Sequence, residues 1–186
     1  MFLLLPKFAF AFPNIDPHNL IPKKILIEAL SFYEKNNSLF PNKKFMSIIN
    51  YGIPSQKKRF FIINLENGSV WSLHVAHGSG SDPKHKGIAA WFSNKPNSNA
   101  SSLGFYKTTQ VYEGKHGISL RLEGLSSTNS KAYERAIVLH GADYVKEADV
   151  IQGRSWGCPA IANQYRDSVI EKLKEGSLIY VTSSKQ

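Results

Sequence analysis

The chain's only cysteine, Cys158, lies in the stretch GRSWGCPA, residues 153–160. A thiol acts as a nucleophile when a base deprotonates it and N–H donors face the oxyanion that forms on the substrate. Gly157 has no side chain, so a carbonyl group can approach closely, and the amides of Gly157 and Cys158 are candidate donors. Pro159 suits the first position of a helix, and a helix N-terminus beside Cys158 would lower the pKa of its thiol.

His140 is the candidate base among the six histidines. An apolar run, residues 136–139, ends at His140, and Gly141 follows it. This pattern predicts a strand end, where a rigid scaffold presents an exposed side chain. We expect His140 to depress the pKa of the Cys158 thiol together with the helix terminus. From residue types alone, a buried structural thiol and a capped, hydrogen-bonded histidine remain alternatives.

The elements that must position this pair follow from periodicity. Apolar residues at helical spacing predict helices over 22–36 and 164–174. Alternating or apolar runs, with a hairpin turn at Asn67-Gly68, predict strands; they cover residues 45–51, 59–65, 69–76, 105–112, 118–123, 136–139 and 177–182. We therefore expect one mainly β domain with a few helices (α+β), over residues 21–186, without repeats or an interdomain linker.

Residues 77–104 differ in composition from the rest of the chain. They are rich in Gly, Ser, Asn, Pro and Lys, apart from the apolar run 88–92. Loops of this length inside compact domains are usually functional lids or mobile insertions. Both interpretations stay open for this segment, its apolar run is a candidate anchor to the domain, and His77 and His116 are candidates to line the groove.

The charge and the N-terminus bear on partners and location. With 23 basic and 14 acidic residues, the formal net charge is +9, which favours an anionic partner. The lysines are scattered, so a solvated basic surface explains them better than a nucleic-acid stripe. Residues 1–20 begin MFLLLPKFAFAFPN, which fits an export signal or an apolar tail that docks on the domain. We expect export, no transmembrane span and a monomer.

The sequence contains no clear pattern for a metal site or a phosphate-binding loop. His74 and His77 fall on opposite faces of a strand, and no acidic or thiol partner lies at ligand spacing. The glycines after His77 lack the Gly-Lys-Ser/Thr that a phosphate-binding loop needs. We therefore expect no metal and no cofactor.

The spacing from His140-Gly141 to Ser155-Trp156-Gly157-Cys158 closely resembles the motif of the L,D-transpeptidase catalytic domain, the YkuD type. The resemblance extends to LGFYKTTQVYEGKHGISLRLEGL and NSKAYERAIVLHGADYV, and covers roughly residues 25–184. It implies a β-sandwich-like fold with the active site in a groove under a mobile lid.

The resemblance also implies a reaction. The cysteine attacks the carbonyl of the third residue of a peptidoglycan tetrapeptide stem, usually meso-diaminopimelate, and releases D-Ala. An amine from a second stem or a wall-tethered protein then resolves the thioester; water as acceptor would make the enzyme an L,D-carboxypeptidase. By position, Cys158 is the nucleophile, His140 the base oriented by the Gly141 carbonyl, and Ser155 the support of the loop.

Departures from the motif concern substrate contacts. Trp156 stands where the family more often has histidine, and the arginine that commonly follows the cysteine is missing. Arg154 is the candidate replacement, and arginine forks match carboxylates.

Other residues near the motif have competing interpretations. Tyr106 and Arg121 are further candidates for the stem carboxylate, although they also fit a core aromatic and an exposed strand arginine. Asp143 could orient His140, but we favour a surface acid. A non-catalytic binder of an anionic glycan or nucleic acid is the more remote alternative, and we expect no nucleic-acid partner.

Overall fold

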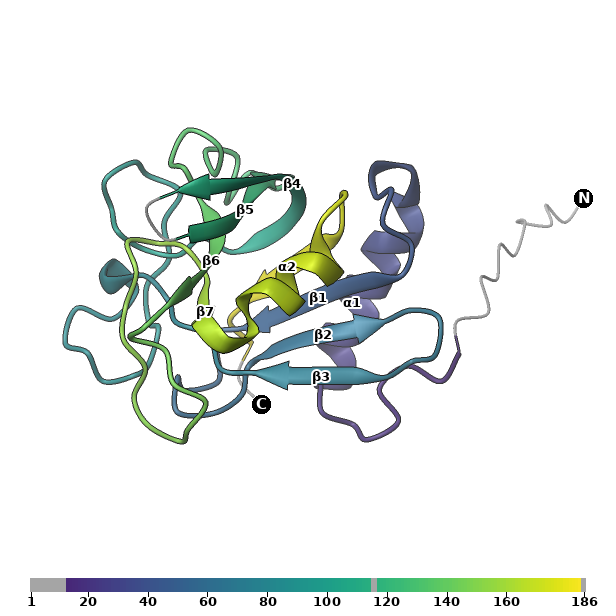
Figure 1. Cartoon of the computed structure of the whole chain (residues 1–186), viewed down its shortest axis with the longest axis horizontal. Coiled ribbons are helices and arrows are strands. Elements are labelled where there is room, and N and C mark those ends of the chain that lie inside the picture. Colours follow the sequence, from purple (N-terminus) through teal and green to yellow (C-terminus); the bar gives the residue numbers. More distant parts are fainter. Residues whose placement is uncertain (1–12, 115–116, 185–186) are drawn as a thin grey trace, which may run out of the picture.

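The computed structural model describes residues 13–114 and 117–184, and one eight-stranded sheet organises them (Figure 1). The strands are β1 (Phe45–Asn50), β2 (Phe60–Asn64), β3 (Val70–Leu73), β4 (Gly104–Gly114), β5 (Gly117–Gly124), β6 (Val138–Ala142), β7 (Ala160–Ala162) and β8 (Leu178–Thr182). The helices are α1 (Lys23–Lys35) and α2 (Arg166–Leu173), with short 3-10 turns η1 (Asn37–Leu39), η2 (Ser79–Ser81) and η3 (Asn163–Tyr165). This confirms the predicted mainly β fold class with a few helices.

The sheet curls until its two edges nearly meet. Its strand order is β3-β2-β1-β8-β4-β5-β6-β7, antiparallel except for the parallel pairs β1–β8 and β6–β7. Just beyond β3, the Ala76 N–H donates to the carbonyl of Ala160 in β7 at 2.8 Å. One continuous, almost closed sheet therefore forms both layers of the β-sandwich-like fold that the resemblance implies.

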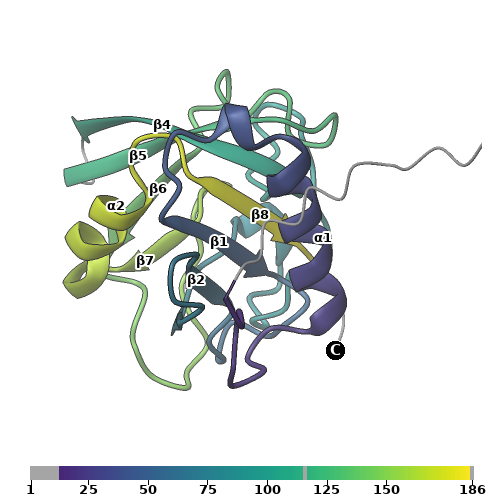
Figure 2. The same ribbon diagram turned by 90° about the vertical axis from the view of Figure 1, so that its right-hand side faces the viewer.

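Each face of the sheet carries its own core, because successive strand residues point to opposite faces. α1 covers one face at β1, β2 and β8, where Met46, Ile48 and Tyr180 meet Ile25 and Ala29. Figure 2 shows α2 on the other side of the sheet from α1. There α2 packs against strands of both halves of the sheet and fills the concave interior.

The predicted helices and most predicted strands are confirmed, with two corrections. Pro159 does not begin a helix; residues 160–162 form β7, which the sequence analysis missed. The strand predicted over 136–139 begins only at Val138, because Ala136 has a left-handed backbone with φ of 52°. In that conformation Ala136 ends a turn, with its N–H donating to the Tyr133 carbonyl.

The prediction for residues 1–20 falls partly outside the described residues, which begin at 13. Within 13–20, Asp16 is buried and its carboxylate accepts the N–H groups of Leu20 and Ile21 at 3.0 and 2.7 Å. Its own N–H donates to Gly68 in the β2–β3 turn. In the part of the chain described, no helix is long and apolar enough to cross a membrane.

Candidate active site

Cys158 and His140 line the same open pocket, of about 370 Å³. Three further parts of its lining are the tip of the β4–β5 hairpin, the turn that ends at Ala136, and the segment that carries Tyr144. This volume is in the range of small-molecule and peptide side-chain sites.

The parallel pairing of β6 and β7 brings the two residues together. His140 is the register partner of Ala160, and Cys158 lies two residues before Ala160. Cys158 therefore lies level with Val138, whose side chain shares a face with that of His140. His140 is inside β6 and 3% exposed, so the expectation of an exposed strand end was wrong.

A hydrogen bond fixes the tautomer of His140. Its Nδ1 lies 2.9 Å from the Gly141 carbonyl oxygen, which can only accept, so Nδ1 carries the proton and donates. The neutral ring then has its lone pair on Nε2, as a base requires. Asp143 is exposed and its carboxylate accepts from Asn163 Nδ2 at 2.7 Å, which fits the surface acid that the sequence analysis favoured.

The Cys158 thiol is held by the backbone of the neighbouring turn and strand. The Val138 N–H donates to Sγ at 3.5 Å, and Sγ lies 3.8 Å from the Ala136 carbonyl oxygen. A donor aimed at sulfur stabilises the thiolate. The predicted helix terminus is absent, and of these two groups only the Val138 N–H is a donor to sulfur, whereas the Ala136 carbonyl accepts from the neutral thiol.

Ser155 closes the cysteine loop, which we define as residues 153–159. Its hydroxyl donates to the Cys158 carbonyl at 2.6 Å and accepts the Gly157 N–H at 3.1 Å. Gly157 has φ of +123°, and a Cβ there would come within 2.8 Å of the Ala100 carbonyl oxygen. Only glycine fits this position.

The Gly157 amide is therefore engaged within the loop rather than aimed into the pocket. The expectation that it serves as an oxyanion donor conflicts with its bond to Ser155 Oγ. Ser155 supports the loop, as the resemblance implies, rather than offering its hydroxyl to the solvent side, and it is 5% exposed.

Residues 77–104 brace the cysteine loop from behind. The Ser155 N–H donates to the His77 carbonyl at 3.0 Å, and the Ser79 N–H donates to the Ser155 carbonyl at 2.8 Å. Ser101 Oγ accepts the Gly78 N–H and donates to the Gly157 carbonyl. No residue of this segment is among those that line the described pocket, and its hydrogen bonds make it a brace of the cysteine loop.

A family model described as the L,D-transpeptidase catalytic domain matches residues 18–182. The chain belongs to this family. Among curated proteins, none matches it.

Several solved structures are similar to the chain at low identity. An L,D-transpeptidase from Mycobacterium smegmatis has 10% identity and a TM-score of 0.48, covering 75% of this chain and 59% of its own. One from Xylanimonas cellulosilytica has 14% identity and a TM-score of 0.42, covering 76% and 63%. Bd1075 from Bdellovibrio bacteriovorus has 11% identity and a TM-score of 0.48, covering 82% and 51%. The chain thus spans less than two thirds of the length of these proteins.

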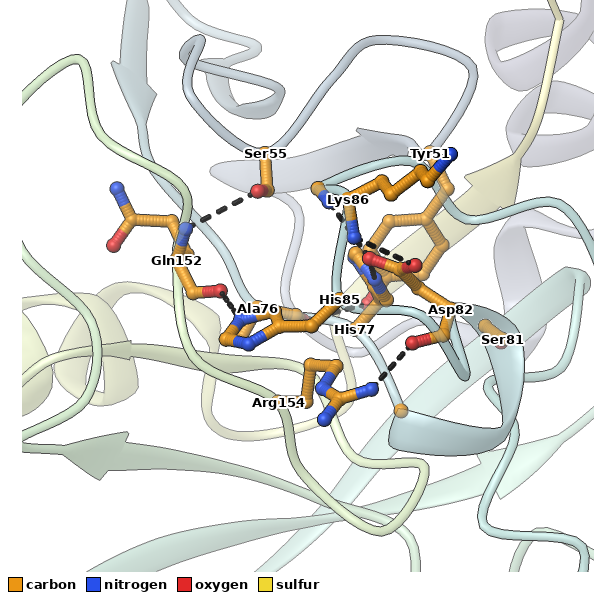
Figure 3. A network of polar contacts seen from close by, with 12 residues as sticks. Tyr51, Ser55, Ala76, His77, Ser81, Asp82, His85, Lys86, Gln152 and Arg154 are labelled. Carbon is orange, nitrogen blue, oxygen red and sulfur yellow. Dashed lines mark hydrogen bonds and ion pairs between the residues drawn. The ribbon is translucent and has the colours of Figure 1, made fainter.

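Of the residues that were predicted to bind substrate in this L,D-transpeptidase domain, some line the pocket and others lie away from it. Arg154 and Trp156 line the pocket, and Trp156 is 74% exposed. Arg154 also donates through Nη1 to the carbonyl of buried Asp82 (Figure 3). Arg121 lies outside the pocket lining, with its guanidinium 5.3 and 5.0 Å from the ring centres of Tyr112 and Tyr133.

Tyr106 does not reach the pocket surface. It is 2% exposed, and its hydroxyl donates to the Ser102 carbonyl at 2.8 Å. Burial raises its pKa to about 12, so it stays neutral. A role for Tyr106 in binding a carboxylate directly does not fit this position.

The sequence analysis missed several pocket residues, which come from separate elements; they are Tyr112, Ser119, Arg135 and Tyr144. Ser119 could have been found from the strand pairing, since it is the register partner of His140. The described lining holds two arginines and no acidic side chain, which makes the pocket electropositive.

The candidate metal ligands have other partners. His74 is buried, with Nδ1 3.1 Å from Glu147 Oε2, and His85 Nε2 lies 2.9 Å from the Gln152 carbonyl oxygen. His77 is buried behind the cysteine loop, and His116 lies outside the described residues. Among the described residues, no group of three or more His, Cys, Asp or Glu could hold a metal.

Proposed function

We propose that this protein is an L,D-transpeptidase in which Cys158 is the nucleophile and His140 the general base. The observation that carries the proposal is one pocket that holds both a thiol with a backbone N–H aimed at its sulfur and a histidine whose Nδ1–H is held by Gly141. Membership of the family supports the same assignment.

In the first half-reaction, His140 Nε2 takes the thiol proton and the Cys158 thiolate attacks the carbonyl carbon of the donor peptide. The C–N bond then breaks, and His140 returns the proton to the leaving amine. A thioester on Cys158 remains. The amide of Cys158 is our candidate donor to the oxyanion, because that of Gly157 is engaged by Ser155.

In the second half-reaction, an acceptor amine attacks the thioester and gives its proton to His140 Nε2. The C–S bond breaks, a new amide forms, and His140 returns the proton to the thiolate. If water is the acceptor, the product is a free carboxylate and the enzyme is an L,D-carboxypeptidase.

The substrate that we propose is a peptidoglycan tetrapeptide stem, cleaved between its third residue, usually meso-diaminopimelate, and D-Ala. Stem peptides carry carboxylates, which guanidinium groups bind well. Arg154, at the pocket and next to Ser155, is the candidate contact. A peptidoglycan substrate places the working enzyme outside the cytoplasmic membrane, so we propose that it is exported. We also propose that it acts as a monomer.

The experiment is muropeptide profiling of purified sacculi treated with wild type, Cys158→Ala or His140→Ala. We expect the wild type to consume tetrapeptides and form cross-links between third residues, and both variants to lose this activity. Tripeptides without new cross-links would favour the carboxypeptidase reaction. Unchanged sacculi, or equal activity in Cys158→Ala, would refute the proposal.

A further inference from the structure

Arg135 places a fixed guanidinium in the pocket that holds Cys158. Its Nη1 donates to the Ser93 carbonyl at 2.7 Å, and its Nη2 donates to the Ala100 carbonyl at 2.6 Å. The hydroxyls of Ser102 and Ser98 lie 3.3 and 3.4 Å from Nη1 and Nη2. All four acceptors are neutral, and among the described residues no acidic side chain forms an ion pair with Arg135.

The backbone of Arg135 is fixed as firmly as its side chain. Its N–H donates to the Lys131 carbonyl at 2.9 Å, in the turn that ends at Ala136. The Ala136 carbonyl is the one that Cys158 Sγ contacts. On the other side, a Cβ on Gly157 would lie 3.0 Å from Arg135 Nη2. The cation is thus held against both the turn and the loop that position the thiol.

We propose that Arg135 is a positioning residue for Cys158: its uncompensated charge stabilises the thiolate. The inference rests on the proposed nucleophilic role of Cys158. The resemblance leads one to expect an arginine after the cysteine, which the chain lacks, and Arg135 brings a guanidinium to the pocket that holds Cys158.

Electrostatic coupling between the two groups supports this role. Burial lowers the pKa of the Arg135 guanidinium, whereas interaction with the ionised forms of Tyr106 and Cys158 acts to raise it. Such coupling is reciprocal, so the guanidinium favours ionised Cys158. Because arginine stays protonated in proteins, its effect persists when His140 is neutral and ready to act as a base.

The test is the rate of iodoacetamide alkylation against pH, followed by intact mass. One cysteine in the chain makes every adduct report on Cys158. Arg135→Gln removes the charge while its amide can still donate to a carbonyl. We expect its alkylation midpoint to rise by about one pH unit relative to wild type. Arg121→Gln loses the same charge outside the pocket lining and should leave the midpoint within about 0.3 unit.

A second pair of variants tests the charge without removing Arg135. Ser98 is partly exposed beside Nη2, so Ser98→Asp places a carboxylate next to the guanidinium, and Ser98→Asn is its neutral match. We expect Ser98→Asp to raise the midpoint and Ser98→Asn to leave it unchanged. This pair decides the matter if Arg135→Gln does not fold.

The outcomes separate the inference from the proposed function. A wild-type midpoint near the ordinary thiol value of about 8.5 would contradict activation of Cys158 itself. A low wild-type midpoint that neither Arg135→Gln nor Ser98→Asp changes would leave Arg135 a tether for residues 93–102 and overturn the inference.

Discussion

At the scale of single residues, Gly141 and Ser155 hold the two groups of the proposed catalytic pair, His140 and Cys158. A Cβ on Gly141 would lie 2.2 Å from Asn163 Oδ1, so a larger residue there would displace the Asn163 side chain. The Gly141 carbonyl holds His140 Nδ1. Ser155 has the equivalent task for Cys158, since it satisfies two backbone groups of the cysteine loop.

Ser155→Ala should impair catalysis more than folding. The change leaves the Gly157 N–H and the Cys158 carbonyl without their shared partner, so the nucleophile shifts in the pocket. We expect kcat/KM to fall on the order of tenfold to a hundredfold in a muropeptide assay. Ser155→Thr keeps the hydroxyl and should recover most of the activity; an active Ser155→Ala would contradict the bracing role.

The sequence predicted roles for Cys158, His140, Gly141 and Ser155 because their types and spacing resemble one local motif, within residues 140–158. It could not indicate Arg135 in the same way, since an arginine in an irregular turn has no periodicity to assign its direction. Tyr106 was predicted as a substrate contact but is buried. An aromatic residue on a strand can face the core or a groove, and only the pairing with neighbouring strands decides which.

At the scale of elements, residues 77–104 and the cysteine loop work as a unit. Gly78 is in close backbone contact with this loop, since a Cβ there would lie 2.8 Å from the Gly157 Cα. Composition predicted an irregular segment correctly, but not its hydrogen bonds. Serines and asparagines that suit a solvated lid also suit a brace, because their side chains bond to backbone groups in turns.

Ser101→Ala should detach this brace from the cysteine loop. Ser101 is 2% exposed, and its removal leaves the Gly78 N–H and the Gly157 carbonyl unsatisfied. We expect a loss of about 1–3 kcal/mol in the free energy of unfolding, measured in urea. Ser130→Ala, which loses an exposed hydroxyl contact to Asn94, should cost less than about 0.5 kcal/mol. Equal effects would mean that Ser101 has no special role.

One prediction about an element was wrong, and it concerns β7. A proline after a cysteine suits a helix start, and the short apolar run 160–162 is ambiguous by pattern alone. Pairing with β6 decides in favour of a strand, and that pairing is nonlocal. The same pairing brings Cys158 level with β6. The error therefore affected the secondary structure assigned to residues 160–162, and the proposed pair of Cys158 and His140 does not depend on it.

At the scale of the whole molecule, a buried polar cluster ties the sheet to the cysteine loop. Arg59 is fully buried and donates through Nη2 to His77 Nδ1 at 2.7 Å. The proton of His77 is therefore on Nε2, which faces Asp82 Oδ2 at 3.5 Å. The carbonyl of Asp82 in turn accepts from Arg154 at the pocket (Figure 3).

This cluster predicts a loss of stability in acid. Burial, and then the charge of Arg59, lower the pKa of His77 from 6.5 to about 4. Between these values the unfolded chain binds a proton that the folded protein does not, so the free energy of unfolding falls as pH falls from 6.5 towards 4. The contribution is on the order of 3 kcal/mol.

Urea unfolding of wild type and His77→Gln at pH 7 and pH 4.5 measures this effect. Glutamine does not titrate, so the difference in unfolding free energy between the two pH values should be smaller in His77→Gln than in wild type. An identical pH dependence in both proteins would show that His77 is not the group responsible.

The central claim is that Cys158 accepts an acyl group with help from His140. The most direct test is intact-protein mass spectrometry after incubation with a carbapenem, whose strained β-lactam carbonyl can acylate a thiolate. We predict one covalent adduct on the wild type, none on Cys158→Ala, and much slower formation on His140→Ala. An unmodified wild type, or an equal adduct on Cys158→Ala, would contradict the account.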